Sequence, residues 1–209
     1  DFKINSLNKL SLGKFSGDIN KTISLSKSKK KDFILFNLNP TQKIIIVNLK
    51  NYNLPLENEK KGAEFFDFIK SNSIFVCTFV EENFKINTDK NKNFLDEFIH
   101  GAQLKSYNFK KYKTKKELEN YEFNISYRSK NFRYNKDKRY DSLIDGTTYT
   151  KDLVSEPGNV LHPDEYAKRL TSLKKYGLKV NIYDQKKLKK LGMNALLGVG
   201  QGSVRGSYL

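Results

Sequence analysis

The sequence has only one cysteine, Cys77, so no disulfide can form within the chain. This excludes a disulfide-stabilised secreted scaffold and fits a reducing compartment. Long apolar runs are also missing, since none approaches the roughly 20 residues of a membrane-spanning helix. No signal-peptide pattern opens the chain, and its first residue is Asp1 rather than methionine. We therefore expect a cytoplasmic protein with no membrane partner, and a chain that is a segment of a longer one.

Acidic residues are scarce beside basic ones: 23 Asp and Glu face 39 Lys and Arg, a net charge of +16. Such an excess fits binding to nucleic acid, to an anionic membrane surface or to an acidic partner. Asn and Ile are as visibly enriched as Lys, however, and a genome rich in A and T would produce all three without any binding role. The excess is spread over both parts of the chain, as a compositional bias would make it, and both explanations stay open.

Hydrophobic patterns in the first 130 residues predict alternating strands and helices. The predicted strands are 21–26, which alternates only weakly, 32–38, 43–49, 73–80 and 122–127. Asn39–Gln42 is a predicted tight turn, and 73–80 is expected to be buried because it is rich in β-branched and aromatic residues. Apolar spacing predicts helices over 59–70 and 92–104. This alternation indicates an α/β fold.

The remaining residues predict a linker followed by further α/β elements. In chain order these are a polar loop at 128–139, a helix at 140–154, a helix from Pro163, a strand at 178–183 and a helix at 184–191. His162 is the expected N-cap of the helix that Pro163 opens, Asp164 and Glu165 lie in its first turn, and Gly177 closes it.

Three glycines alternate near the end of the chain, in residues 188–203 (LKKLGMNALLGVGQGS). A dinucleotide-binding turn needs G-x-G-x-x-G between a strand and a helix. Counted from Gly198 the sixth residue is Ser203, and counted from Gly200 it is Arg205, so the pattern fails. We predict a glycine-rich turn that leaves a buried apolar segment.

No residue is assigned a catalytic or metal-binding role. His100 and His162 are 62 positions apart, and neither has a second ligand at i+3 or i+4. We expect both to be structural, and Cys77 to be a small buried apolar residue rather than a nucleophile.

Basic and aromatic residues interleave over 105–140. Cations can contact phosphates while rings stack on bases, so this stretch predicts possible nucleic-acid contacts, with DNA as a partner, at Lys110, Lys111, Lys113 and Arg133. The alternative is an exposed linker whose rings pack on a neighbouring domain.

Three blocks resemble the leucyl (cytosol) aminopeptidase family. Residues 151–167 (KDLVSEPGNVLHPDEYA) are similar to its interdomain segment, and residues 188–203 to the signature before its catalytic core. Residues 106–114 resemble a segment of bacterial members. Two positions differ from the family pattern: Ser155 replaces the usual Asn, and His162 replaces a Thr that caps the helix more effectively.

The resemblance implies three parts. Residues 1–130 would form a macro-like α/β domain with a mixed sheet flanked by helices, 131–156 a linker and interdomain helix, and 157–209 the truncated start of a metallopeptidase catalytic domain. It also implies a cytoplasmic homo-hexamer that removes N-terminal residues from peptides with two divalent ions, Mn, Zn or Mg.

The two acidic motifs that supply the family's metal ligands are not in this sequence. We therefore expect the 209-residue segment to bind no metal and to be inactive alone, as the non-catalytic N-terminal part of an active aminopeptidase. Two alternatives remain: a basic nucleic-acid-binding module, alone or as a second role of the peptidase, and a macro-like domain that binds an ADP-ribose-type ligand.

Overall fold

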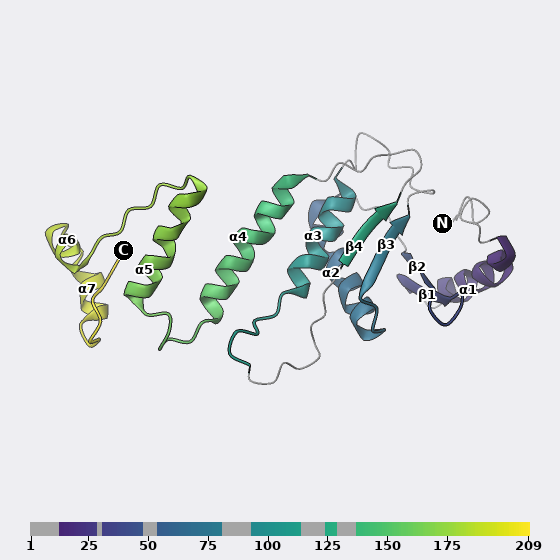
Figure 1. The fold of residues 1–209 in the computed structure, drawn as a ribbon, viewed down its shortest axis with the longest axis horizontal. Coiled ribbons are helices and arrows are strands. Elements are labelled where there is room, and N and C mark those ends of the chain that lie inside the picture. Colours follow the sequence, from purple (N-terminus) through teal and green to yellow (C-terminus); the bar gives the residue numbers. More distant parts are fainter. Residues whose placement is uncertain (1–12, 29–30, 48–53, 81–92, 114–123, 129–136) are drawn as a thin grey trace. The chain divides into compact units, whose positions relative to one another are not determined.

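The computed structural model describes residues 13–28, 31–47, 54–80, 93–113, 124–128 and 137–209 (Figure 1). The chain divides into two compact units, Asp1–Thr147 (unit 1) and Thr148–Leu209 (unit 2). Helix α4 (Lys138–Ser155) contains the boundary between them.

Unit 1 begins, within the described residues, with a short 3-10 helix (Gly13–Phe15) and helix α1 (Ser16–Ser28). The strand predicted at 21–26 is therefore wrong. Ile19 and Ile23 are both buried and lie four residues apart, which is the spacing of one helix face. Residues 21–26 therefore belong to a helix whose buried face includes Ile19 and Ile23, and the weak alternation of apolar and polar residues within 21–26 does not produce a strand.

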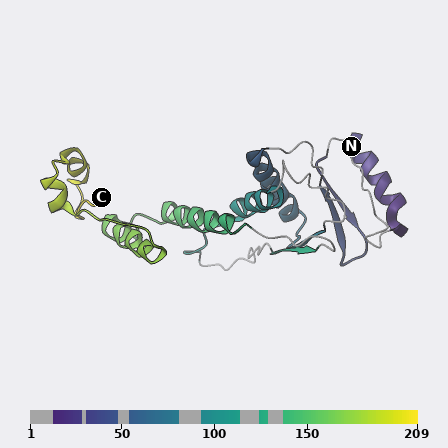
Figure 2. The same ribbon diagram turned by 90° about the horizontal axis from the view of Figure 1, so that it is seen from above.

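Strands β1 (Phe33–Asn37) and β2 (Lys43–Val47) form an antiparallel hairpin, in which Phe33 lies opposite Val47. The predicted turn is confirmed: the Asn39 side chain accepts hydrogen bonds from the backbone N–H groups of Thr41 (2.9 Å) and Gln42 (2.7 Å). Apolar side chains of the hairpin pack against α1 and also against α2 and α3. Figure 2 shows the ribbon of the hairpin beside α1, the purple helix.

Strands β3 (Val76–Val80) and β4 (Asn124–Arg128) pair in parallel, with Val76 opposite Asn124. The first is shorter than the predicted 73–80 and is not wholly buried, because Phe75 and Val76 are exposed. Ser73 has a positive φ of 53° and belongs to the turn that follows α2. Among the described residues the strands thus form two pairs, one antiparallel and one parallel.

Helices α2 (Pro55–Ser71) and α3 (Phe94–Ser106) hold the main core, and both predicted helices are confirmed. Their buried residues form one cluster: Phe65, Phe66, Ile69, Phe94, Phe98 and Ala102. The two helices cross at glycines. A Cβ built on Gly62 would overlap the carbonyl oxygen of Phe98, and one built on Gly101 would overlap that of Glu59. The backbones therefore touch at a distance that only glycine allows.

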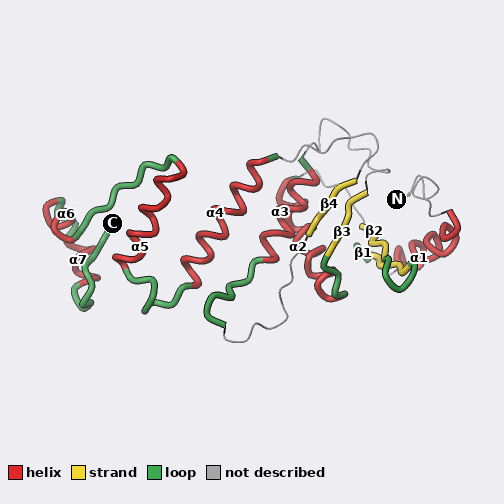
Figure 3. The backbone as a smooth tube through the Cα atoms, viewed as in Figure 1, coloured by secondary structure: helices red, strands yellow, loops and turns green. Residues whose placement is uncertain are grey.

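Unit 2 continues with α5 (Pro163–Thr171), a 3-10 helix (Ser172–Tyr176), α6 (Gln185–Lys190) and α7 (Asn194–Gly200) (Figure 3). The predicted helix start at His162 is confirmed. Gly177 ends the 3-10 helix with a φ of 82°, as expected for a glycine in this position. Asp184 caps α6 by accepting a hydrogen bond from the Lys187 N–H (2.9 Å).

One prediction for unit 2 is wrong, and another is wrong in part. Residues 178–183 form no strand: among the described residues, Tyr183 is the one member of this stretch that exchanges backbone hydrogen bonds with another segment, at Leu209 (2.7 and 3.0 Å). The glycine run does not follow a buried segment either: Gly198 and Gly200 lie in α7, none of whose residues is buried. The turn follows α7 instead, at Gln201 and Gly202, where the Ser203 N–H donates to the Gly200 carbonyl (3.0 Å).

The α/β class is confirmed by the alternation of helices and strands in unit 1. Within the described residues, none of the helices is both long and apolar enough to cross a bilayer.

Candidate functional site

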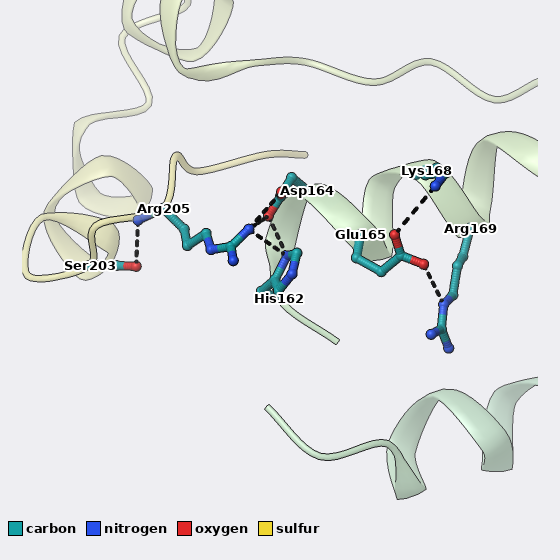
Figure 4. Close-up of polar contacts among 7 residues, drawn as sticks. All are labelled: His162, Asp164, Glu165, Lys168, Arg169, Ser203 and Arg205. Carbon is teal, nitrogen blue, oxygen red and sulfur yellow. Dashed lines mark hydrogen bonds and ion pairs between the residues drawn. The ribbon is translucent and has the colours of Figure 1, made fainter. Parts of the chain in front are cut away.

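The N-terminus of α5 carries a cluster of charged side chains (Figure 4). The His162 N-cap makes no side-chain capping bond. Its Nδ1 instead lies 2.5 Å from Asp164 Oδ1, and Arg205 Nη1 lies 3.0 Å from Asp164 Oδ2. Arg205 follows α7, so this contact joins two segments about 40 residues apart within unit 2.

The same cluster lowers the pKa of Asp164. Burial raises it, but hydrogen bonds from the residue's own backbone and from His162, with the charges of His162 and Arg205, outweigh that effect. Asp164 is therefore ionised at neutral pH, which also suits the positive end of the helix dipole.

A second group of charges surrounds Arg169 of α5. Its Nη1 donates to Glu156 (2.9 Å) and its Nε donates to Glu165 (3.0 Å). The Glu156 side chain is only 1% exposed. Hydrogen bonds to Glu156 and then Glu165 raise the pKa of Arg169, and the bond from Arg169 lowers that of Glu165. Arg169 of α5 thus binds Glu156, the first residue after α4, and holds that loop against α5.

We expect Arg169→Ala to lower the melting temperature measured by circular dichroism, because the buried carboxylate of Glu156 then loses its ion pair with the Arg169 guanidinium. Adding Glu156→Gln should recover part of the loss, since the neutral amide costs less to bury. Lys168→Ala is the matched control, because this neighbouring side chain is 82% exposed. Equal melting temperatures for Arg169→Ala and Lys168→Ala would contradict the assignment.

Unit 1 has a buried polar layer between α2, α3 and the start of α4. Asn58 donates to Glu97 (2.5 Å), and His100 Nδ1 lies 2.8 Å from Glu59 Oε1. The Tyr140 ring packs edge-on against His100, and its hydroxyl lies 3.5 Å from Glu97. Burial, then the charge of Glu97, raises the pKa of Tyr140 to about 12. These contacts hold the three helices in register.

The polar layer places His100 among carboxylates, but it does not resemble a metal centre. Within the residues that the structure describes, no group of three or more His, Cys, Asp or Glu side chains could hold a metal ion. The described residues therefore do not fit a two-metal site.

Cys77 lies half-buried on β3, and burial raises the pKa of its thiol to about 11. At neutral pH the thiol stays protonated, and the thiol is a far weaker nucleophile than the thiolate. The structure thus gives Cys77 a packing role against the core cluster.

The basic and aromatic stretch forms a tight turn after α3, closed by a hydrogen bond from the Lys113 N–H to the Lys110 carbonyl (3.2 Å). Lys110, Lys111 and Lys113 lie together in this turn, while Arg133 lies outside the described residues. Three of the four predicted nucleic-acid contacts are therefore brought together.

Sequence reasoning missed the buried polar layer and the Glu156–Arg169 pair. The i, i+4 spacing of Glu165 and Arg169 is a signal that could have indicated an ion pair. Asn58 and Glu97 are 39 residues apart, so no local pattern connects them.

Comparison with solved structures defines the fold class. A mutant of tomato leucine aminopeptidase superposes with a TM-score of 0.72 at 17% identity, over 94% of this chain and 42% of that one. The bottromycin maturation enzyme BotP in complex with Mn gives a TM-score of 0.65 at 15% identity, over 88% of this chain and 40% of that one. At these identities the likeness concerns the fold alone.

Sequence comparison supplies the family. Residues 148–209 match the profile described as "Cytosol aminopeptidase family, catalytic domain". A "Probable cytosol aminopeptidase" of Bradyrhizobium sp. (strain BTAi1) is 43% identical over 116 residues, 51% of this chain and 22% of that protein. One from Caulobacter vibrioides is 36% identical over 155 residues, 72% of this chain and 30% of that protein.

The chain belongs to the cytosol aminopeptidase family, as the resemblance of its sequence blocks predicted. It spans between about a fifth and a third of the length of these curated relatives.

Proposed function

We propose that this chain is the non-catalytic N-terminal part of a leucyl aminopeptidase that removes N-terminal amino acids from peptides. One observation carries the proposal: residues 148–209 match the family's catalytic-domain profile, yet the described residues include no cluster that could hold a metal ion. A two-metal peptidase needs such a cluster to polarise the scissile carbonyl and to generate its nucleophile.

In this proposal residues 1–130 are the macro-like domain, 131–156 the linker and interdomain helix, and 157–209 the first part of the catalytic domain. The two divalent ions, Mn, Zn or Mg, belong to the longer protein, which acts as a cytoplasmic homo-hexamer. The names of the relatives, cytosol aminopeptidases, support this location.

The test compares leucine p-nitroanilide hydrolysis by the 209-residue chain and by a version extended with the coding sequence downstream of Leu209. Both are assayed with added manganese and, as the control, after treatment with a chelator. We expect metal-dependent hydrolysis from the extended protein only. Hydrolysis by the 209-residue chain that the chelator abolishes would refute the inactive assignment, and an extended protein without activity would refute the peptidase assignment.

A second candidate function, for the basic unit 1, is binding to nucleic acid. The observation that favours it is the turn that brings Lys110, Lys111 and Lys113 together. In this proposal the lysines contact phosphates, so binding weakens steeply as salt rises.

A further inference from the structure

The stretch after α3 is strongly basic and has no acidic residue. Residues 105–116 contain six lysines, three aromatic residues and neither Asp nor Glu. Lys105 belongs to α3 and is paired with Asp67 (3.1 Å), whereas Lys110, Lys111 and Lys113 lie in the turn that follows the helix. We call residues 107–113 the basic turn.

Tyr112 presents a ring at the tip of the basic turn. Its side chain is 49% exposed. The Phe109 ring lies beside it, with centroids 5.9 Å apart, and Lys111 Nζ lies 5.5 Å from the Tyr112 centroid. The exposed ring thus has the Phe109 ring beside it and the ammonium group of Lys111 near its centroid.

This arrangement fits an unpaired base next to its phosphate. Exposed aromatic faces stack on bases of any sequence, while neighbouring lysines follow the backbone. In a duplex the faces of the bases are already covered by their neighbours, and the major groove admits a helix or a β-ribbon, neither of which a seven-residue turn provides. Interfacial membrane binding uses a helix with an apolar face, and residues 107–113 contain no aliphatic side chain.

We propose that the basic turn binds single-stranded nucleic acid, with Tyr112 stacking on a base and Lys110, Lys111 and Lys113 contacting phosphates. This inference rests on the second candidate function and deepens it by naming the form of the nucleic acid. The peptidase proposal does not depend on it.

The chain contains a matched control. Lys174-Lys175-Tyr176 repeats the Lys-Lys-Tyr sequence of the basic turn, and Tyr176 is 71% exposed with Lys175 Nζ 4.8 Å from its ring centroid. The residues that flank this second tripeptide are Leu173 and Gly177, whereas Phe109 and Lys113 flank the tripeptide of the basic turn. General attraction between exposed Lys-Tyr pairs and nucleic acid would therefore affect both sites alike.

The experiment measures the fluorescence anisotropy of labelled oligo(dT) of about 12 nucleotides, within the site sizes of known single-strand binders. The 209-residue chain is titrated at several salt concentrations, with a duplex of equal length and with anionic phosphatidylserine vesicles as competitors. We expect Tyr112→Ala to weaken binding about fivefold or more, Tyr112→Phe to retain it, and Tyr176→Ala to leave it unchanged. The triple variant Lys110→Gln, Lys111→Gln and Lys113→Gln should reduce the slope of log binding constant against log salt concentration by about 2.

Circular dichroism of each variant verifies that the fold is kept. Equal affinity of Tyr112→Ala and the unchanged chain would overturn the inference, as would an equal loss in Tyr176→Ala. Binding to the duplex alone would overturn it while leaving the nucleic-acid function intact. Binding to neither form, or to vesicles only, would reject both.

Discussion

Gly62→Ala is expected to destabilise unit 1 by about 3 kcal/mol or more, at or beyond the upper end of the range for overpacked sites. The added methyl group would overlap the carbonyl oxygen of Phe98 on the facing helix. Backbone atoms cannot change rotamer to make room, so α2 and α3 would have to move apart. Gly101→Ala, which would overlap the carbonyl of Glu59, should have a similar effect.

Urea unfolding followed by circular dichroism measures this loss as a lower midpoint. The matched control is Gly146→Ala in α4, where an added Cβ meets no atom within 4 Å. That change should stabilise the chain by about 0.5–1 kcal/mol, because alanine loses less conformational freedom in a helix. If Gly62→Ala and Gly146→Ala shifted the midpoint alike, the close crossing of α2 and α3 would be refuted.

Phe98→Ala is expected to cost about 3–5 kcal/mol, the range for a fully buried aromatic residue. Phe98 is 1% exposed, and its ring lies 5.2 Å from Phe65, 5.7 Å from Phe79 and 5.8 Å from Phe94, centroid to centroid. Removing it would open a cavity between α2, α3 and β3. Domains are commonly stable by only about 5–15 kcal/mol, so much of the stability of unit 1 would be lost.

Phe75→Ala supplies the comparison, because Phe75 is 47% exposed. We expect this change to cost much less than Phe98→Ala when both are measured by the free energy of unfolding in urea. Phe98→Leu should fall between the two, since leucine fills part of the volume. A loss for Phe98→Ala no larger than that for Phe75→Ala would contradict the position of Phe98 in the core.

The elements that could be predicted are those whose residues carry a complete local signal. In α2 and α3 the apolar residues recur at helical spacing over three turns or more, and that face becomes the core. The turn at 39–42 was predictable because Asn39 bonds to the backbone two and three residues ahead. The start of α5 followed from Pro163 and the acids after it.

The elements that were predicted wrongly depend on partners that the local sequence does not reveal. Residues 21–26 alternate weakly, but their helix is set by packing on the hairpin through Ile19 and Ile23. Residues 178–183 have strand-like composition, yet within the part of the chain that the structure describes only Tyr183 of this stretch pairs with another segment, and a strand needs a continuous ladder.

In the candidate site, too, the local features could be predicted from the sequence and the contacts between distant segments could not. His162 and Asp164 could be placed at a helix start because capping is local. Their contact with Arg205 could not be predicted, since 41 residues separate Arg205 from Asp164. The same holds for the polar layer, where Glu97 and Asn58 meet only because the two helices cross at glycine.

That crossing limits which variants of this chain can persist. Every other standard amino acid has a Cβ, so each amino-acid replacement that a single base change produces in a glycine codon adds an atom at Gly62 or Gly101. A saturation library selected for folded protein should therefore be depleted of nearly all replacements at these two positions, in contrast to Gly146. A replacement at Gly62 or Gly101 could be accepted only if the backbone of the facing helix moved away first.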